Sequence, residues 1–391
     1  MSAHPLSNDF PSAAAVPCAL CVRPGSQLRT SARTCPLNPA GKPGALFLTV
    51  LLLALCGAVG CRSIGPGTVQ RDRLHYSAAV AESWKEQLLL NIVKTRYGDA
   101  PAFLEVSSLV SGYSLETGVT INGQFSPENL RGDSFAGGEL SGKFTDRPTI
   151  SYSPMTGERF ARSLLSPVPL DGLLFAIQGG TSAGLLLRVA AQSCEGHYNR
   201  GVHGGRPDPG DTEFARLSEL LQTLQEARVV EIEVRKQGDH AEIWLELRDR
   251  VGHADTTAEL KTLLHIPPTL ARVRVVFGIE AIEPELIALR TRSLMQMLTV
   301  LGTGVQIPEE HLADGRALAV GGVPAPQWLT VHSGCKRPDA AFVSVPYEGT
   351  WFWIARDDLA SKATLSVVTM LFSYLDNSGR QSAPVLTIPT N

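Results

Sequence analysis

The sequence predicts an α+β fold, with mixed helices and antiparallel hairpins in a globular exported domain. Two patterns carry this prediction. Apolar residues recur at helical spacing from Tyr76 to Tyr97. Apolar and charged residues alternate from Val230 to Leu247, on both sides of a Gly-Asp pair that suits a two-residue turn. A composition of 43% hydrophobic and 19% charged residues is that of an ordinary globular chain with a packed core.

The N-terminal segment carries the pattern of an export signal. Lys42 leads into an apolar run over 45–59, which is shorter than the roughly 20 apolar residues that span a bilayer. The small residue Gly60 then precedes Cys61. This order is typical of a bacterial lipoprotein signal, so we predict that Cys61 is lipidated. The alternatives are an uncleaved anchor and an ordinary secretory signal.

Lipidation at Cys61 would determine both the domain organisation and the location. Each buried CH₂ contributes about 0.8 kcal/mol, so two or more acyl (palmitate-type) chains hold a protein durably on a membrane. Arg62 stands where lipoproteins of the inner membrane tend to carry Asp, which favours the outer membrane, facing the periplasm. The predicted parts are a removed leader over 1–60, a lipidated cysteine with a flexible tether over 61–70, and a globular region over 71–391, in which subdomains 71–205 and 206–391 stay open.

Local composition predicts the elements that follow the helix expected from Tyr76 to Tyr97. Gly98 and Pro101 end that helix. The stretch 102–125 has the composition of strands, and a Gly-rich connector is expected over 131–143. The stretch 149–160 predicts a strand that runs through a turn into a short helix.

The centre of the chain gives the clearest local signals. Asp211 is placed to cap a helix, because apolar residues at helical spacing follow it. In the hairpin after this helix, a two-residue turn sets Val234 opposite Ile243 and puts every apolar residue on one face. The same register sets Glu231 opposite Glu246, a like-charge pair that we expect to be solvated.

A second hairpin is predicted to turn at residues 348–349. Trp351 and Trp353 then share one face, where their indoles can stack on a sugar ring of peptidoglycan or another polysaccharide. The alternative is that both indoles are buried under a helix that Asp357 or Asp358 would cap.

One motif suggests catalysis. Residues 180–184 match G-x-S-x-G, and they lie between an apolar run and a helix-compatible segment, as the nucleophile elbow of a serine hydrolase requires. Ser182 would be the nucleophile. No oxyanion loop of the HGGG type precedes it and regular β-α alternation is missing, so a hydrolase is the alternative. Its triad partners in chain order would be Asp239 or Asp255, followed by His265 or His311.

The remaining residues point to no cofactor, metal ion or nucleic acid. His197 and His203 lie on a Gly-bearing stretch without a carboxylate pattern, and the chain has no HExxH, P-loop or dinucleotide motif. With a net charge of −3 and no basic cluster, the chain has no polyelectrolyte character, and nucleic acid is not among the expected partners. Four of the seven cysteines precede Cys61, which leaves Cys194 and Cys335 either as a disulfide or as two separate thiols.

Four stretches resemble an uncharacterised family of proteobacterial envelope lipoproteins. The longest is RDRLHYSAAVAESWKEQLLLNIVKTRYGDAP, from Arg71 to Pro101, and the others are ISYSPMTGERF, AFVSVPYEGTWFWIARDDLASK and APVLTIP. They are spread from Arg71 to Pro389, along most of the chain after Cys61. The resemblance implies a lipoprotein, and it brings no activity and no catalytic residue with it.

The sequence as a whole therefore predicts a lipid-anchored protein of the cell envelope that acts by binding or assembly. Its expected partners are the membrane, through the lipid, and envelope proteins or cell-wall glycan. The alternatives are an anchored hydrolase using Ser182 and a glycan-binding module using Trp351 and Trp353.

Overall fold

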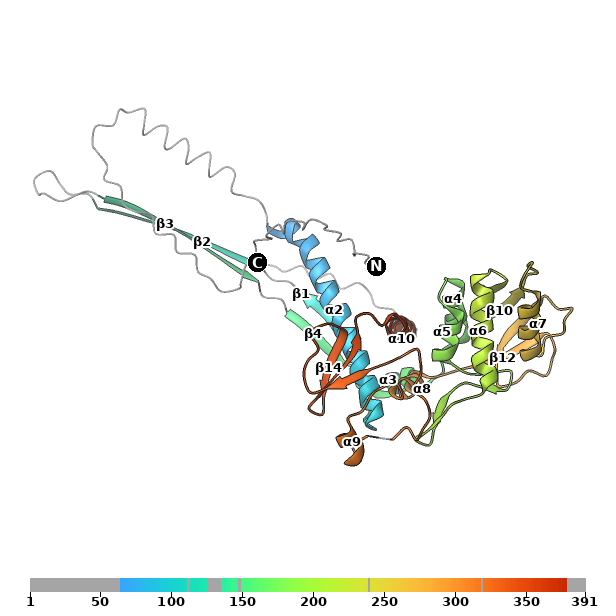
Figure 1. Cartoon of the computed structure of the whole chain (residues 1–391). Coiled ribbons are helices and arrows are strands. Elements are labelled where there is room, and N and C mark those ends of the chain that lie inside the picture. The colour runs from blue at the N-terminus through green and yellow to red at the C-terminus, as the bar shows by residue number, and fades with distance from the viewer. Residues whose placement is uncertain are drawn as a thin grey trace, which may run out of the picture. The chain divides into compact units, whose positions relative to one another are not determined.

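The computed structural model describes residues 64–110, 113–124, 135–146, 149–237, 240–317 and 319–377 (Figure 1). It confirms the α+β class. The chain divides into two compact units, with 109–149 in the first and 63–108 together with 150–391 in the second. This division differs from the boundary at residue 205 that the sequence left open.

The helices and strands have the following bounds. The helices are α2 (Ile64–Arg96), α3 (Gly157–Leu165), α4 (Leu170–Gln178), α5 (Ala183–Ala190), α6 (Thr212–Glu226), α7 (Ala254–Leu263), α8 (Leu294–Gly302), α9 (Glu309–Ala313) and α10 (Leu359–Asn377). The strands are β1 (Leu104–Val110), β2 (Tyr113–Gln124), β3 (Phe135–Asp146), β4 (Thr149–Pro154), β5 (Ala191–Cys194), β6 (His197–Tyr198), β7 (Gly201–His203), β8 (Arg206–Asp208), β9 (Val230–Gln237), β10 (His240–Leu247), β11 (Arg272–Phe277), β12 (Leu286–Thr291), β13 (His332–Gly334), β14 (Ala341–Tyr347) and β15 (Thr350–Ala355).

The described part of the first unit is a long two-stranded ribbon. β2 and β3 pair antiparallel along their full length, from Tyr113 opposite Asp146 to Gln124 opposite Phe135. Twelve residues of strand extend about 40 Å. The expectation of a Gly-rich connector over 131–143 was therefore wrong for the residues of β3. A ladder is built from backbone groups, so a strand forms here although its glycines interrupt the apolar alternation that would have revealed it.

Helix α2 begins earlier than the sequence indicated. It starts at Ile64, so the flexible tether expected up to residue 70 is helical from that residue onward. Pro66 lies in the first turn, where its missing N–H would have no partner in any case. Side chains from Asp72 to Gln87 are exposed or half-buried, and the core begins at Leu88.

A six-stranded sheet forms the middle of the second unit, in the order β6-β5-β12-β11-β10-β9. Only β11 and β12 run parallel. The register predicted for the β9–β10 hairpin is confirmed, with Val234 opposite Ile243 and Glu231 opposite Glu246. Arg248 lies between the two carboxylates and forms ion pairs with both, so a cation as well as water offsets their repulsion.

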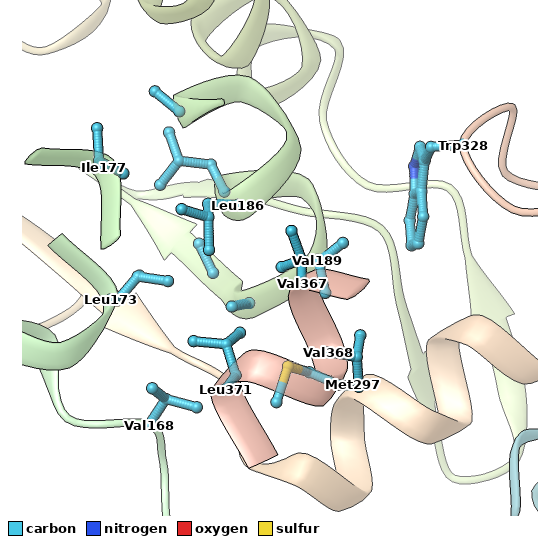
Figure 2. Packing of buried hydrophobic residues seen from close by; sticks show 14 of the residues in the cluster. Val168, Leu173, Ile177, Leu186, Val189, Met297, Trp328, Val367, Val368 and Leu371 are labelled. Atoms are coloured by element: carbon cyan, nitrogen blue, oxygen red, sulfur yellow. The ribbon is translucent and has the colours of Figure 1, made fainter. Parts of the chain in front are cut away.

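Helices α4, α5 and α6 cover the apolar face of this sheet. Figure 2 shows where α4 and α5 meet α8 and α10, with Leu173, Leu186, Met297 and Leu371 directed into a common core. All four side chains are at most 1% exposed.

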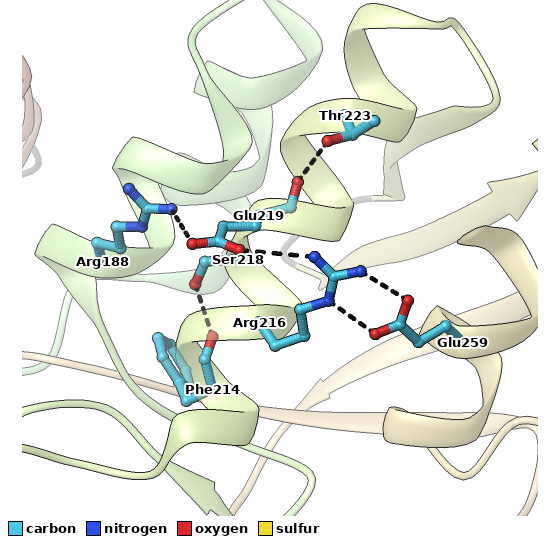
Figure 3. A network of polar contacts seen from close by, with 7 residues as sticks. All are labelled: Arg188, Phe214, Arg216, Ser218, Glu219, Thr223 and Glu259. Atoms are coloured by element: carbon cyan, nitrogen blue, oxygen red, sulfur yellow. Dashed lines mark hydrogen bonds and ion pairs between the residues drawn. The ribbon is translucent and has the colours of Figure 1, made fainter.

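Charged side chains join α5, α6 and α7 on their outer surface (Figure 3). Arg216 of α6 binds both carboxylate oxygens of Glu259 on α7, at 2.7 and 2.8 Å. Glu219 forms ion pairs with Arg216 at 3.7 Å and with Arg188 of α5 at 3.9 Å. Because these pairs are exposed to water, they stabilise the protein only weakly.

Candidate functional site

The small sheet β13-β15-β14 has one buried face and one partly exposed face. Phe352 and Ile354 of β15 are fully buried, whereas Trp351 and Trp353 are half-buried on the opposite face. The predicted turn is confirmed: residues 348 and 349 have φ angles of 47° and 76°, as a two-residue hairpin requires.

The buried face of this sheet packs on α2. The ring of Tyr97, directly after α2, meets Phe352 edge-on, with centroids 6.1 Å apart. Helix α10 follows as predicted, and the Asp358 carboxylate accepts from the Ser361 amide at 3.0 Å. In the alternative that the sequence left open, a helix buries both indoles. In the structure, Trp351 and Trp353 are half-buried.

The two indoles have basic neighbours. The guanidinium carbon of Arg337 lies 5.4 Å from the ring centroid of Trp351, within cation–π range. The His332 ring lies 5.7 Å from Trp353, which it faces across the β13–β15 ladder. Gly334 leaves room for Trp353, since a Cβ there would approach the indole to 3.2 Å. We call the two half-buried indoles, together with Arg337 and His332, the Trp351/Trp353 face.

Ser182 occupies a different setting from the predicted nucleophile elbow. The apolar run before it is helix α4, where an elbow needs a strand. Ser182 is the N-cap of α5: its Oγ accepts from the Leu185 amide at 3.2 Å and donates to Gln222 Oε1 at 2.7 Å. Both interactions of the hydroxyl are therefore accounted for by helix α5 and its neighbour α6.

The proposed triad partners have other roles. Asp239 lies outside the described residues. Asp255 lies in the first turn of α7, and His265 follows that helix with a φ angle of 53°. His311 is 5% exposed, and its Nδ1 lies 2.6 Å from the Tyr97 hydroxyl. Within the described part of the chain, no histidine makes a hydrogen bond with Ser182.

Among the described residues, the two cysteines and the histidines form no joint site. Cys194 is buried and Cys335 exposed, and both thiols are free, so of the two alternatives the structure has separate thiols and no disulfide. Burial raises the pKa of the Cys194 thiol, and the charge of Glu195 raises it further. His197 meets the Leu263 carbonyl at 3.2 Å, and His203 lies 3.9 Å from Asp208.

Two absences hold for the described ranges. No three His, Cys, Asp or Glu side chains come together there as metal ligands. None of the helices in those ranges combines the length and the apolar character that crossing a bilayer requires.

The sequence analysis did not single out Arg292, which is 2% exposed. Its Nη1 donates to the carbonyls of Arg188 and Val189, at 2.9 and 3.0 Å, and its Nη2 donates to the carbonyl of Arg200. The sequence offered only a weak signal, an arginine directly between a buried strand and the serine cap of α8.

Comparisons of the chain with protein-family profiles, with curated proteins and with solved structures find no significant match. Cys61 and the leader lie outside the described residues. The geometry of the second unit is therefore what carries the functional argument.

Proposed function

We propose that this chain is a lipid-anchored protein of the bacterial envelope that acts by binding. The observation that carries the proposal is the Trp351/Trp353 face. One face of the small sheet is buried on α2, while the other presents two half-buried indoles with a guanidinium and an imidazole on them. Half-buried aromatic side chains with a polar rim are characteristic of binding surfaces.

The position of α2 supports a membrane anchor at Cys61. The helix begins three residues after this cysteine, and its first 20 residues, up to Ser83, precede Trp84, whose ring packs against Phe372 of α10. At 1.5 Å per residue they extend about 30 Å. A helix of this length acts as a stiff spacer between an acylated cysteine and the folded region, in place of the flexible tether that we expected.

The anchor is tested by the intact mass of the membrane-extracted protein, with Cys61→Ala alongside. We expect a chain that begins at Cys61 and carries acyl mass, and we expect the variant to lose that mass. A wild-type chain that retains residues before Cys61 without acyl mass would refute the anchor. Fractionation of inner and outer membranes then tests the predicted outer-membrane location.

Cell-wall glycan is the ligand that the Trp351/Trp353 face favours. Sugar rings stack on indoles through their C–H faces, and Arg337 and His332 can pair with acidic substituents of a glycan. Soluble peptidoglycan fragments should quench tryptophan fluorescence in the wild-type protein. The double variant Trp351→Phe/Trp353→Phe should lose the quenching.

Trp244 provides a matched control for this titration. It is also half-buried on a strand beneath an arginine, with the Arg272 guanidinium carbon 4.4 Å from its ring centroid, but it has no second indole beside it. Trp244→Phe should leave the quenching intact. Equal loss in both variants, or no quenching by any fragment, would rule out glycan binding and leave assembly with envelope proteins, for which co-purified partners are the measurement.

A further inference from the structure

A small cavity lies between helix α8 and the segment that contains β6 and β7. Its volume is about 90 Å³, which is room for several water molecules. Polar side chains on both sides reach its wall. They include Gln192, Tyr198, Arg292 and Thr299.

Arg292 brings a buried positive charge to this wall. It is 2% exposed and makes no ion pair with any acidic residue of the described chain. Its carbonyl partners at residues 188 and 189 belong to the last turn of α5, whose dipole carries only about half a negative charge. The carbonyl partners thus compensate the guanidinium charge only in part.

A second arginine adds to this excess. Burial, and then the charge of Arg200, lowers the pKa of Arg292 to about 9, so it stays protonated at neutral pH. Burial also lowers the pKa of Arg200. Two acidic residues of the segment after β7 have other partners: Asp208 pairs with His203, and Asp211 accepts from the Tyr198 amide.

We propose that this cavity binds a small oxyanion, a carboxylate or phosphate group, that pairs with Arg292. The N–H groups of Arg292 that do not donate to the three carbonyls can donate to such an anion, and charge-assisted hydrogen bonds of this kind are about twice as strong as neutral ones. Gln192 and Tyr198 on the wall provide further N–H and O–H donors for its oxygens. The site is separate from the Trp351/Trp353 face, and it does not depend on the proposed function.

The test is thermal unfolding of the full membrane-extracted protein at constant ionic strength. Chloride is replaced stepwise by acetate in one series and by inorganic phosphate in another. We expect a saturating rise of the unfolding midpoint in at least one series, and the responding series identifies carboxylate or phosphate. No rise beyond that in chloride, or a rise that does not saturate, overturns the proposal.

Variants locate the response. Thr299→Leu fills the cavity, and the hydroxyl it removes bonds only to the Met295 carbonyl of its own helix. The Thr299→Leu variant should bind the anion at least tenfold more weakly than the wild type. Thr223→Leu is the matched control, because Thr223 makes the same type of bond to the Glu219 carbonyl on the exposed side of α6, and it should keep the response.

If Thr299→Leu does not fold, Val202→Phe fills the same cavity from the β7 side. An undiminished response in a folded filling variant would place the anion elsewhere and overturn the proposal.

Discussion

Ser182→Ala separates a structural serine from a catalytic one. The substitution removes the acceptor for the Leu185 amide and the donor to Gln222. Loss of an N-cap serine costs about 1 kcal/mol, and loss of one further partly buried hydrogen bond costs about another 1 kcal/mol. We therefore expect the free energy of unfolding to fall by about 2 kcal/mol, which is a substantial part of the stability of a typical domain.

The assay is urea unfolding of membrane-extracted protein, followed by circular dichroism. Ser182→Thr retains a hydroxyl at the cap and should recover most of the lost stability. Ser366→Ala is the control, since the Ser366 hydroxyl bonds only to the Lys362 carbonyl on the exposed side of α10. It should leave stability unchanged or slightly raised, because alanine is the better helix former.

Two results would refute this reasoning. Ser182→Ala could be as stable as the wild type, which would mean that the hydroxyl does not cap α5. A fluorophosphonate probe could label the wild type and fail to label Ser182→Ala, which would mean that the serine is a nucleophile. We expect no labelling of Ser182.

Further predictions concern packing, charge and pH. Gly184→Ala should destabilise by about 1–3 kcal/mol in denaturant, because its Cβ would lie 2.8 Å from the Ser218 carbonyl of α6. Phe352→Ala should cost about 3–5 kcal/mol in the same assay, since this ring is fully buried. Arg248→Ala should cost less than about 1 kcal/mol, and added salt should reduce the difference. Burial, and then the hydrogen bond to Asp99, raises the pKa of Tyr347 above 10.0. The protonated Tyr347 hydroxyl therefore stabilises the fold below pH 10.0, and this stabilisation is lost as the pH rises. Tyr347→Phe should make the free energy of unfolding depend less on pH in the alkaline range.

The β9–β10 hairpin was predicted down to single pairs because its information is local. Strict alternation allows one burial pattern, and a two-residue turn allows one register, so the pair Val234–Ile243 follows from the spacing alone. The same logic predicted the β14–β15 hairpin. It could not reveal Arg248, which lies outside the alternating run and separates the two facing glutamates.

Elements without a local signature were missed. The first turns of α2 contain glycines and a proline, which predict a tether, yet the helix continues through them. Helix α4 is a nine-residue apolar segment, and at that length a buried helix and a buried strand give the same pattern. That ambiguity is why the segment before Ser182 fitted a nucleophile elbow.

The candidate sites show the same limit. Which residues share a sheet face follows from period-two spacing, so the pairing of Trp351 with Trp353 was predictable, whereas their partial exposure depends on α2 packing against the other face. Arg292 is the extreme case. Its carbonyl partners precede it by 92 to 104 residues, so no spacing in the sequence connects them. A buried charge of this kind becomes visible only when the fold brings a helix end, a second arginine and a cavity to one place, and the anion titration tests that arrangement directly.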